Sequence, residues 1–233
     1  MSDLAQFPIT RRWPPADPTV IQLYAFPTPN GVKVSIALEE MALPYEAHRV
    51  TLSASDVKSP DFLSLNPNGK IPALIDPNGP DGAPIALWES GAILIYLGEK
   101  TGQLIGTTAA EKYQVIKWVM FQMGGLGPMF GQLGYFTKFA GAEIEDPRPR
   151  QRYVTEGKRL LDVLDSALEG QDWIAGRYSI ADIAIAPWLW ALDTYGTRDV
   201  LGVDDLRNVP AYLDRFVDRP AVRTGLVTPP REA

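Results

Sequence analysis

The chain has 233 residues, 45% of them hydrophobic, which is enough to bury a core in one large domain or two small ones. Its 28 acidic side chains outnumber the 22 basic ones, and a net charge of −6 without any basic run excludes an electrostatic footprint for nucleic acid. With no cysteine and one histidine, His48, the chain cannot form disulfides, a zinc–thiolate site or a cysteine nucleophile of its own. A thiol nucleophile would have to come with a bound molecule.

No apolar stretch approaches the ~20 residues that a membrane-spanning helix needs. Residues 1–18 also lack the apolar core of a signal peptide, so we expect a cytoplasmic protein without a membrane partner. The four prolines among residues 1–18 predict an extended arm at this terminus.

The elements predicted for residues 19–104 alternate between strands and helices. Strands are expected at 20–24, 45–52, 71–75 and 84–88, and helices at 32–41, 60–65 and 89–101. A strand, a helix and a second strand within about thirty residues indicate a βαβ unit. After Gly102 the pattern turns entirely helical, with segments at 109–138 (interrupted at 124–128), 150–168, 180–195 and 209–217. We therefore predict an α/β domain over 19–104 and an all-helical domain over 105–233.

Gly69-Lys70-Ile71-Pro72 opens one of the predicted strands with a proline. Such a proline is either a plain edge residue or the second residue of a cis peptide bond in a tight turn. A cis bond would turn the backbone N–H and C=O of Ile71 outward, where an extended peptide can pair with them.

Glu89-Ser90 stands at the predicted start of the helix 89–101. In isolation the pair is read as an ordinary helix cap beside an exposed acid. A serine hydroxyl and free N–H groups at a helix start can also bind a carboxylate, and Glu89 could hold an ammonium group. Together with the Lys70–Pro72 segment, the pair suits a γ-glutamyl α-amino acid group followed by a peptide backbone.

These two motifs, with the capping box Ser179-Ile180-Ala181-Asp182, resemble the glutathione transferases over residues 20 to about 220. The resemblance implies a thioredoxin-like N-terminal domain, an all-α C-terminal domain and a homodimer. The segment 26–33, Phe-Pro-Thr-Pro-Asn-Gly-Val-Lys, and the segment Gly124–Met129 resemble the Nu class, which is related to bacterial disulfide-bond reductases and to a fungal nitrogen-regulator prion protein.

The resemblance also implies roles for particular residues. Thr28 and Asn30 would lie by the glutathione sulfur, and Arg152 would contact a second glutathione. The residues expected to hold the first glutathione are Lys70, Ile71, Pro72, Glu89 and Ser90. A glutamine found in some relatives is absent, with Val57 and Lys58 in its region, which leaves the contact to the glycine carboxylate open.

A thiol of pKa ~8.5 is mostly protonated at pH 7, and lowering its pKa by two units requires about 2.7 kcal/mol. One hydrogen bond to a charged group contributes ~1.5–3 kcal/mol, and a helix N-terminus ~0.3–2 kcal/mol. Thr28 or Asn30 at the start of a helix is therefore sufficient, although both could equally serve only as a cap and turn. Tyr24 and His48 lie inside predicted strands and are interpreted as structural.

The leading hypothesis is a glutathione transferase that reduces disulfides through the thiols of one or two bound glutathiones. Its second substrate would be a small electrophile or disulfide. Glutathione-dependent cleavage of ether or thioether bonds is one alternative, and a non-catalytic glutathione-binding regulator is another. The aromatic and methionine residues between 118 and 139 are expected to form mainly core, with those near the glycine-rich break lining a pocket.

Overall fold

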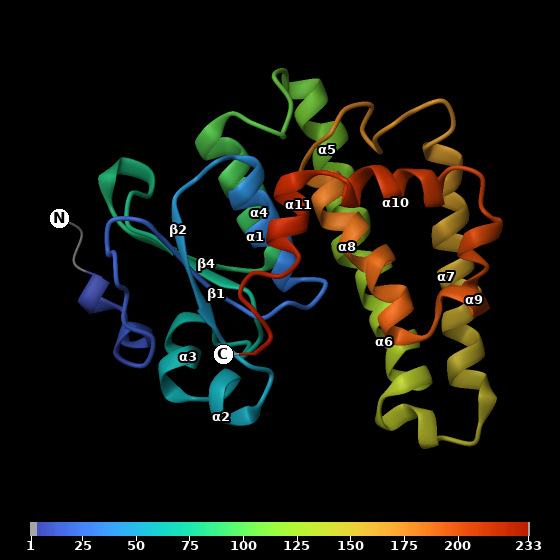
Figure 1. The fold of residues 1–233 in the computed structure, drawn as a ribbon, viewed down its shortest axis with the longest axis horizontal. Helices are drawn as coiled ribbons and strands as arrows, with labels where there is room; N and C mark the ends of the chain where they lie inside the picture. Colours follow the sequence, from blue (N-terminus) through green and yellow to red (C-terminus); the bar gives the residue numbers. More distant parts are fainter. Residues whose placement is uncertain (1–3, 233) are drawn as a thin grey trace. The chain divides into compact units, whose positions relative to one another are not determined.

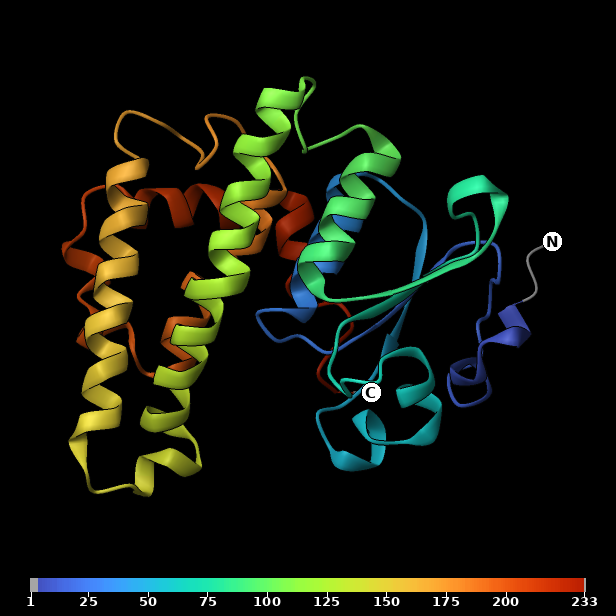
Figure 2. The ribbon, with the colours of Figure 1, turned by 180° about the vertical axis from the view of Figure 1, so that it is seen from behind.

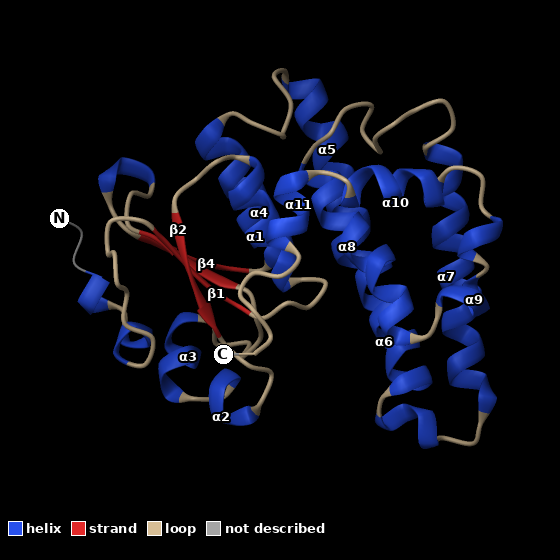
Figure 3. Ribbon diagram, viewed as in Figure 1, coloured by secondary structure: helices blue, strands red, loops and turns tan. Residues whose placement is uncertain are grey.

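The computed structural model describes residues 4–232, which divide into two compact units. The first unit contains the chain up to Thr101 and again from Pro220 onward, and the second contains Gly102–Arg219. The first holds all four strands of the sheet, and the described part of the second is helical (Figures 1 and 3). The predicted combination of a thioredoxin-like α/β region and a helical region is confirmed.

The sheet of the first unit has the strand order β2-β1-β3-β4. The strands are β1 (Ile21–Ala25), β2 (Tyr45–Arg49), β3 (Ala73–Asp76) and β4 (Ile85–Trp88). β1 pairs with β2 in parallel and with β3 in antiparallel fashion, so that Leu23 lies between Ala47 and Leu74. β3 in turn pairs with β4 in antiparallel fashion.

Helices cover both faces of this sheet, which is why all five residues of β1 are buried. α1 (Gly31–Glu40) and α4 (Ser90–Thr101) pack together on one face, and α2 (Ala54–Val57) and α3 (Pro60–Leu65) lie on the other (Figure 2). A short 3-10 helix, Pro80–Gly82, connects β3 and β4.

The last helix, α11 (Pro220–Gly225), belongs to the first unit, although the predicted helical domain extended to residue 233. α11 packs on α1, and the Ser35 hydroxyl donates a hydrogen bond of 2.7 Å to the Gly225 carbonyl. A Cβ on Gly225 would lie 2.6 Å from the backbone of Ile36, so the two helices can approach this closely only because glycine stands there. The chain therefore returns to α1 after leaving the second unit.

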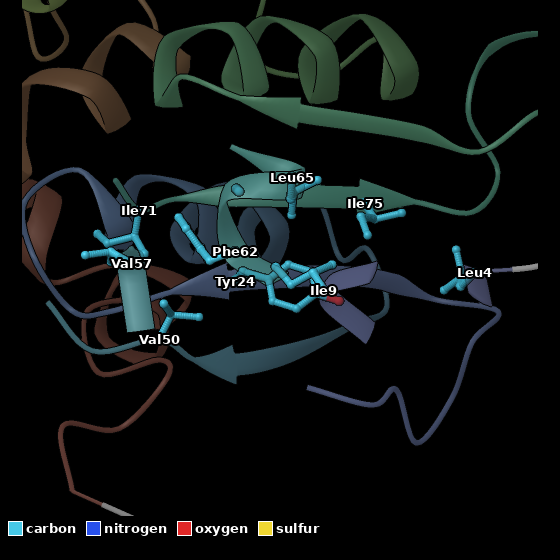
Figure 4. Close-up of a cluster of buried hydrophobic side chains, with 10 residues drawn as sticks. Leu4, Ile9, Tyr24, Val50, Val57, Phe62, Leu65, Ile71 and Ile75 are labelled. Atoms are coloured by element: carbon cyan, nitrogen blue, oxygen red, sulfur yellow. The ribbon is translucent and has the colours of Figure 1, made fainter. Parts of the chain in front are cut away.

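The predicted extended arm is wrong for residues 4–11. Leu4–Gln6 and Pro8–Arg11 form two 3-10 helices, and Leu4 and Ile9 are buried in an apolar cluster on the α3 face of the sheet (Figure 4). Trp13 packs edge-on against Tyr24, and Arg12 forms an ion pair with Asp56. The segment folds because it carries apolar side chains between its prolines, and burying them against the sheet removes them from water.

The second unit consists of helices, most of them long. They are α5 (Ala109–Phe121), α6 (Gly127–Lys138), α7 (Pro147–Ala167), α8 (Ile180–Tyr195), α9 (Arg198–Leu201) and α10 (Val209–Val217), with 3-10 helices at Ala140–Glu143 and Val203–Asp205. In the part of the chain that the structure describes, no helix is both long and apolar enough to cross a membrane.

The predicted interruption of the helix at residues 124–128 is not found. Gln122–Leu126 forms one π-helical stretch that joins α5 to α6. A Cβ on Gly127 would lie 2.3 Å from the Gln122 side chain and 3.2 Å from Trp188, so this glycine admits the Trp188 ring of α8. The segment gives close helix packing rather than an interruption.

A buried capping box opens α8, as the sequence predicts. The Asp182 carboxylate accepts hydrogen bonds from the N–H groups of Ser179 (2.9 Å) and Ile174 (3.0 Å). Ser179 and Asp182 are both buried, so these N–H groups have no water to replace the carboxylate.

Replacing Asp182 by alanine is expected to lower the free energy of unfolding by about 3 kcal/mol, because two buried N–H groups lose their acceptor. Urea denaturation measures the change. Alanine at the exposed Asp162 is the control and should shift stability by less than about 0.5 kcal/mol. Equal effects of the two substitutions would contradict this assignment.

Replacing Ile9 by alanine is expected to destabilise the protein by about 3 kcal/mol, since its side chain is fully buried. Ile144, which is 48% exposed, provides the control substitution. Similar urea midpoints for the Ile9→Ala variant and the wild type would show that the N-terminal segment contributes little to the core.

Candidate functional site

The turn between β1 and α1 places Thr28 and Asn30 at the start of a helix. The Thr28 hydroxyl accepts a hydrogen bond from the Gly31 N–H (3.2 Å), and the Thr28 carbonyl accepts one from the Val32 N–H (3.0 Å). A Cβ on Gly31 would lie 1.9 Å from the Phe26 carbonyl oxygen, so the turn requires glycine there. Because the Thr28 hydroxyl acts as acceptor within the turn, its hydrogen can be donated to another group.

The loop before β3 is held by the buried Asn66 side chain. Its amide donates to the Lys70 carbonyl at 2.6 Å and its oxygen accepts the Asn68 N–H at 3.0 Å. Gly69 has a φ of +63°, the left-handed region that favours glycine. The Ile71–Pro72 peptide bond is cis, the second of the two alternatives considered for this proline.

Lys58 reaches the outer side of the same loop. Its amine donates to the Asn68 carbonyl at 3.4 Å and lies 2.6 Å from where a Cβ on Gly69 would be. Lys58 therefore supports the backbone of this loop, and its role in carboxylate binding stays open.

The junction between β4 and α4 carries Glu89 and Ser90. Glu89 is exposed and has a φ of +72°, a conformation that costs a non-glycine residue of order 1 kcal/mol. Its carbonyl accepts the Ile93 N–H at 3.0 Å and so begins the helix. Ser90 follows as the first residue of α4 and is 3% exposed.

One cavity of the first unit brings these segments together. It is lined by Asn30, Asn66, Asn68, Lys70, Ile71, Pro72, Glu89 and Ser90. Six of the residues predicted for the glutathione site thus line a single cavity, and Thr28 lies two positions before Asn30 in the adjoining turn. The lining contains a cation, an anion, amides and a hydroxyl, which suits a zwitterionic ligand with a peptide backbone.

Lys33 is a charged residue of this site that the sequence reasoning missed. It is fully buried in the first turn of α1, and its amine donates to the Ser90 hydroxyl at 3.3 Å. Burial lowers the pKa of Lys33 to about 7, and the Glu89 carboxylate opposes this shift. Its place between Val32 and Val34, in a helix with no other charged residue before Glu39, was the signal that could have identified it.

Arg152 lies on α7 in the second unit and has an exposed side chain. It lines a cavity of about 460 Å³ together with Met129, Tyr153, Thr155 and Glu156. The Tyr153 ring stacks on Phe136 with ring centroids 5.6 Å apart, which fixes one wall. This cavity is large enough for a small organic ligand.

The aromatic and methionine residues between 118 and 139 divide between core and surface. Phe130 is fully buried, as expected for core, and Met129, beside the glycine-rich segment, lines the cavity of Arg152. Met120, Tyr135 and Phe139 are exposed by 42–51%.

Tyr24 and His48 lie in the packed sheet, and neither is among the residues that line the first cavity. The His48 ring stacks on Tyr24 at 4.7 Å, and its Nε2 is 2.7 Å from the Gln22 side-chain oxygen. Burial lowers the pKa of His48 and raises that of Tyr24. Both positions agree with the predicted structural role.

Two family models match the chain. The one described as "Glutathione S-transferase, N-terminal domain" covers residues 28–100, and "Glutathione S-transferase, C-terminal domain" covers residues 129–219. The disulfide-bond oxidoreductase YfcG of Escherichia coli is 41% identical over 210 residues, which cover 89% of this chain and 95% of that protein.

Solved structures resemble the whole chain. A glutathione transferase from Burkholderia graminis, crystallised with two glutathione molecules per subunit, has a TM-score of 0.97 and 61% identity over 99% of this chain and 97% of that one. A glutathione transferase from Pseudomonas putida, with one glutathione disulfide per subunit, has a TM-score of 0.96 and 57% identity over 98% and 100% of the two chains. Both family models and these relatives show that the chain belongs to the glutathione transferase family.

Proposed function

We propose that the cavity of the first unit binds glutathione and that the protein is a glutathione-dependent disulfide reductase. The observation that carries the proposal is the convergence of Asn30, the Lys70–Pro72 segment and Glu89-Ser90 on one cavity. The relatives crystallised with glutathione or its disulfide, and the homologous oxidoreductase, support the same ligand and reaction.

The residues fit the γ-glutamyl end of glutathione by charge. Ser90 and the first N–H groups of α4 suit the α-carboxylate, because the helix N-terminus carries a partial positive charge. The Glu89 carboxylate suits the α-ammonium group. The backbone of Ile71, next to the start of β3, would pair with the peptide of the ligand, and Lys70 would hold it from the exposed side.

Thr28 and Asn30 are the groups proposed to lower the pKa of the ligand's thiol. The Thr28 hydroxyl oxygen accepts the Gly31 N–H, which leaves the hydroxyl hydrogen to be donated to the sulfur, and Asn30 immediately precedes α1. A charge-assisted hydrogen bond of ~1.5–3 kcal/mol at a helix N-terminus is enough to make the thiolate a major form at neutral pH. The side chains therefore bind and activate a sulfur that they do not supply.

Glutathione supplies the redox chemistry: two of its thiols transfer two electrons and two protons to one disulfide, which yields glutathione disulfide and two product thiols. Two thiols require a second glutathione, and we assign it to Arg152 and the cavity on α7, because a guanidinium can bind a carboxylate with two hydrogen bonds. The Burkholderia graminis enzyme, with two glutathiones per subunit, supports this assignment.

The class of transferase, the oligomeric state, the cellular location and the domain boundary are also proposals. Residues 26–33 and 124–129 support membership of the Nu class, and the protein would act as a cytoplasmic homodimer on small disulfides. The domain boundary that we propose lies near residue 102, with residues 220–233 assigned to the α/β part because α11 packs on α1.

A coupled assay tests the proposed function: the purified protein is given glutathione and a small organic disulfide, and glutathione disulfide is measured with glutathione reductase and NADPH. We expect turnover that depends on protein concentration. Glutathione binding by calorimetry without any turnover would favour a carrier or regulator, and turnover only with aryl ethers or thioethers would favour the bond-cleaving alternative. Either result would overturn the reductase assignment.

Replacing Thr28 by valine, or Asn30 by alanine, is expected to lower kcat/KM about 10- to 100-fold at pH 7, because the thiolate loses a hydrogen bond of ~1.5–3 kcal/mol. The pH profile should shift upward by one to two units, of the order set by the same energy. Thr224→Val, on the exposed side of α11, is the matched control. An unchanged pH profile in both variants would remove these residues from the reaction.

Replacing Arg152 by alanine is expected to weaken the second glutathione at least tenfold and leave the first unaffected, because a charged hydrogen-bond pair is worth ~1.5–3 kcal/mol. Calorimetric titration should show the stoichiometry fall from two to one. Arg148, 88% exposed near the start of the same helix, provides the control. Two intact sites in the Arg152→Ala variant would place the second glutathione elsewhere.

A further inference from the structure

Burying a lysine amine away from water costs free energy of folding. In this chain such an amine lies next to the proposed γ-glutamyl site. Lys33 is fully buried, whereas most lysines of globular proteins reach water. Its amine contacts the hydroxyl of Ser90, a residue that lines the cavity. The Ser90 side chain therefore contacts the buried amine and also lines the cavity.

The charged groups near Lys33 differ in how strongly they act on its amine. Glu89, in the cavity lining, acts on Lys33 through its charge, and burial acts against the charged form more strongly. Of the helices that pack on α1, α4 ends with the exposed pair Glu99 and Lys100, and α11 carries the exposed Arg223. These exposed charges are screened by solvent, so a new charge inside the cavity would act more strongly on Lys33.

We propose that Lys33 is a positioning residue for the α-carboxylate of the γ-glutamyl group: its amine holds the Ser90 hydroxyl oxygen, so that the hydroxyl hydrogen points to the ligand, and it provides a positive charge behind that carboxylate. This inference rests on the proposed glutathione site. In the hydrogen-bond chain the amine donates to Ser90 and Ser90 donates to the carboxylate, and each bond strengthens the other.

The arrangement couples binding to a proton. Because burial brings the pKa of Lys33 to about 7, much of the free protein holds a neutral amine above neutral pH. An incoming carboxylate favours the ammonium form and raises that pKa. At pH 8 the complex should therefore take up close to one proton from solution at Lys33.

The experiment compares the wild type with Lys33→Met, which keeps the length of the side chain and removes its amine. Calorimetry at pH 8, in two buffers of different ionisation enthalpy, gives both the Kd for glutathione and the number of protons taken up. The probe ligands are glutathione and its analogue with an amide in place of the γ-glutamyl α-carboxylate. Lys100→Met is the control, since it removes one positive charge of the same unit at an ion pair with Asp76.

We expect Lys33→Met to bind glutathione at least tenfold more weakly, to bind the amide analogue as the wild type does, and to take up no proton. Lys100→Met should distinguish glutathione from the amide analogue as the wild type does, and should take up the same number of protons. The melting temperature of the unliganded variant should be unchanged or higher, because an apolar side chain replaces a buried amine. A purely structural lysine would instead lower the melting temperature and weaken both ligands equally, which would overturn the inference.

The outcomes separate this inference from the proposed function. If the wild type binds no glutathione, the function itself fails. If the wild type binds glutathione and Lys33→Met retains the same discrimination between the two ligands and the same proton uptake, only the role of Lys33 fails. If the Lys33→Met variant folds poorly, Lys33→Gln replaces it, because glutamine keeps a hydrogen-bond donor and has no charge. Lys33→Gln should take up no proton and keep part of the affinity for glutathione.

Discussion

The antiparallel insertion of β3 between β1 and β4 is the constraint on which the candidate site depends. Because β3 runs opposite to both neighbours, the C-terminal ends of β1 and β4 lie at the same edge of the sheet as the N-terminal end of β3. Short turns then lead from β1 into α1 and from β4 into α4, so two helix N-termini open at that edge. The loop that enters β3 brings Lys70 and Ile71 to the same place.

Such crowding of backbone at one edge restricts the side chains that fit there. Gly31 has no room for a Cβ, and Gly69 adopts a left-handed φ beside Lys58. Glu89 adopts a left-handed φ without being glycine, so its carboxylate is retained against a conformational cost of order 1 kcal/mol. This conformation at the cavity is consistent with the role proposed for the carboxylate.

The parts of this site that the sequence predicts are those set by neighbouring residues. Glu89-Ser90 and the segment before Pro72 are short motifs whose chemistry can be read locally, and the pairing of strands places them together. The helical pattern predicts a domain that continues to residue 233, whereas α11 packs on α1 with a hydrogen bond between residues 190 positions apart, which no local pattern reveals. The prolines of the N-terminal segment predict an extended chain, whereas the burial of Leu4 and Ile9 favours two short 3-10 helices. The burial of Lys33 is not predicted, because a single lysine in a helix is usually solvated.

The place of Lys33 on α1 explains why its charge would follow the ligand. As the third residue of the helix, it lies in the first turn, where the helix dipole disfavours a positive charge, and burial disfavours the same form. Both effects act in the free protein, and Glu89 offsets them only in part. A carboxylate beside Ser90 would supply the missing anion, whereas a neutral group of the same shape would not. Recognition at this end of the site would then depend on ligand charge, while Thr28 and Asn30, at the start of the same helix, would act on the sulfur as proposed.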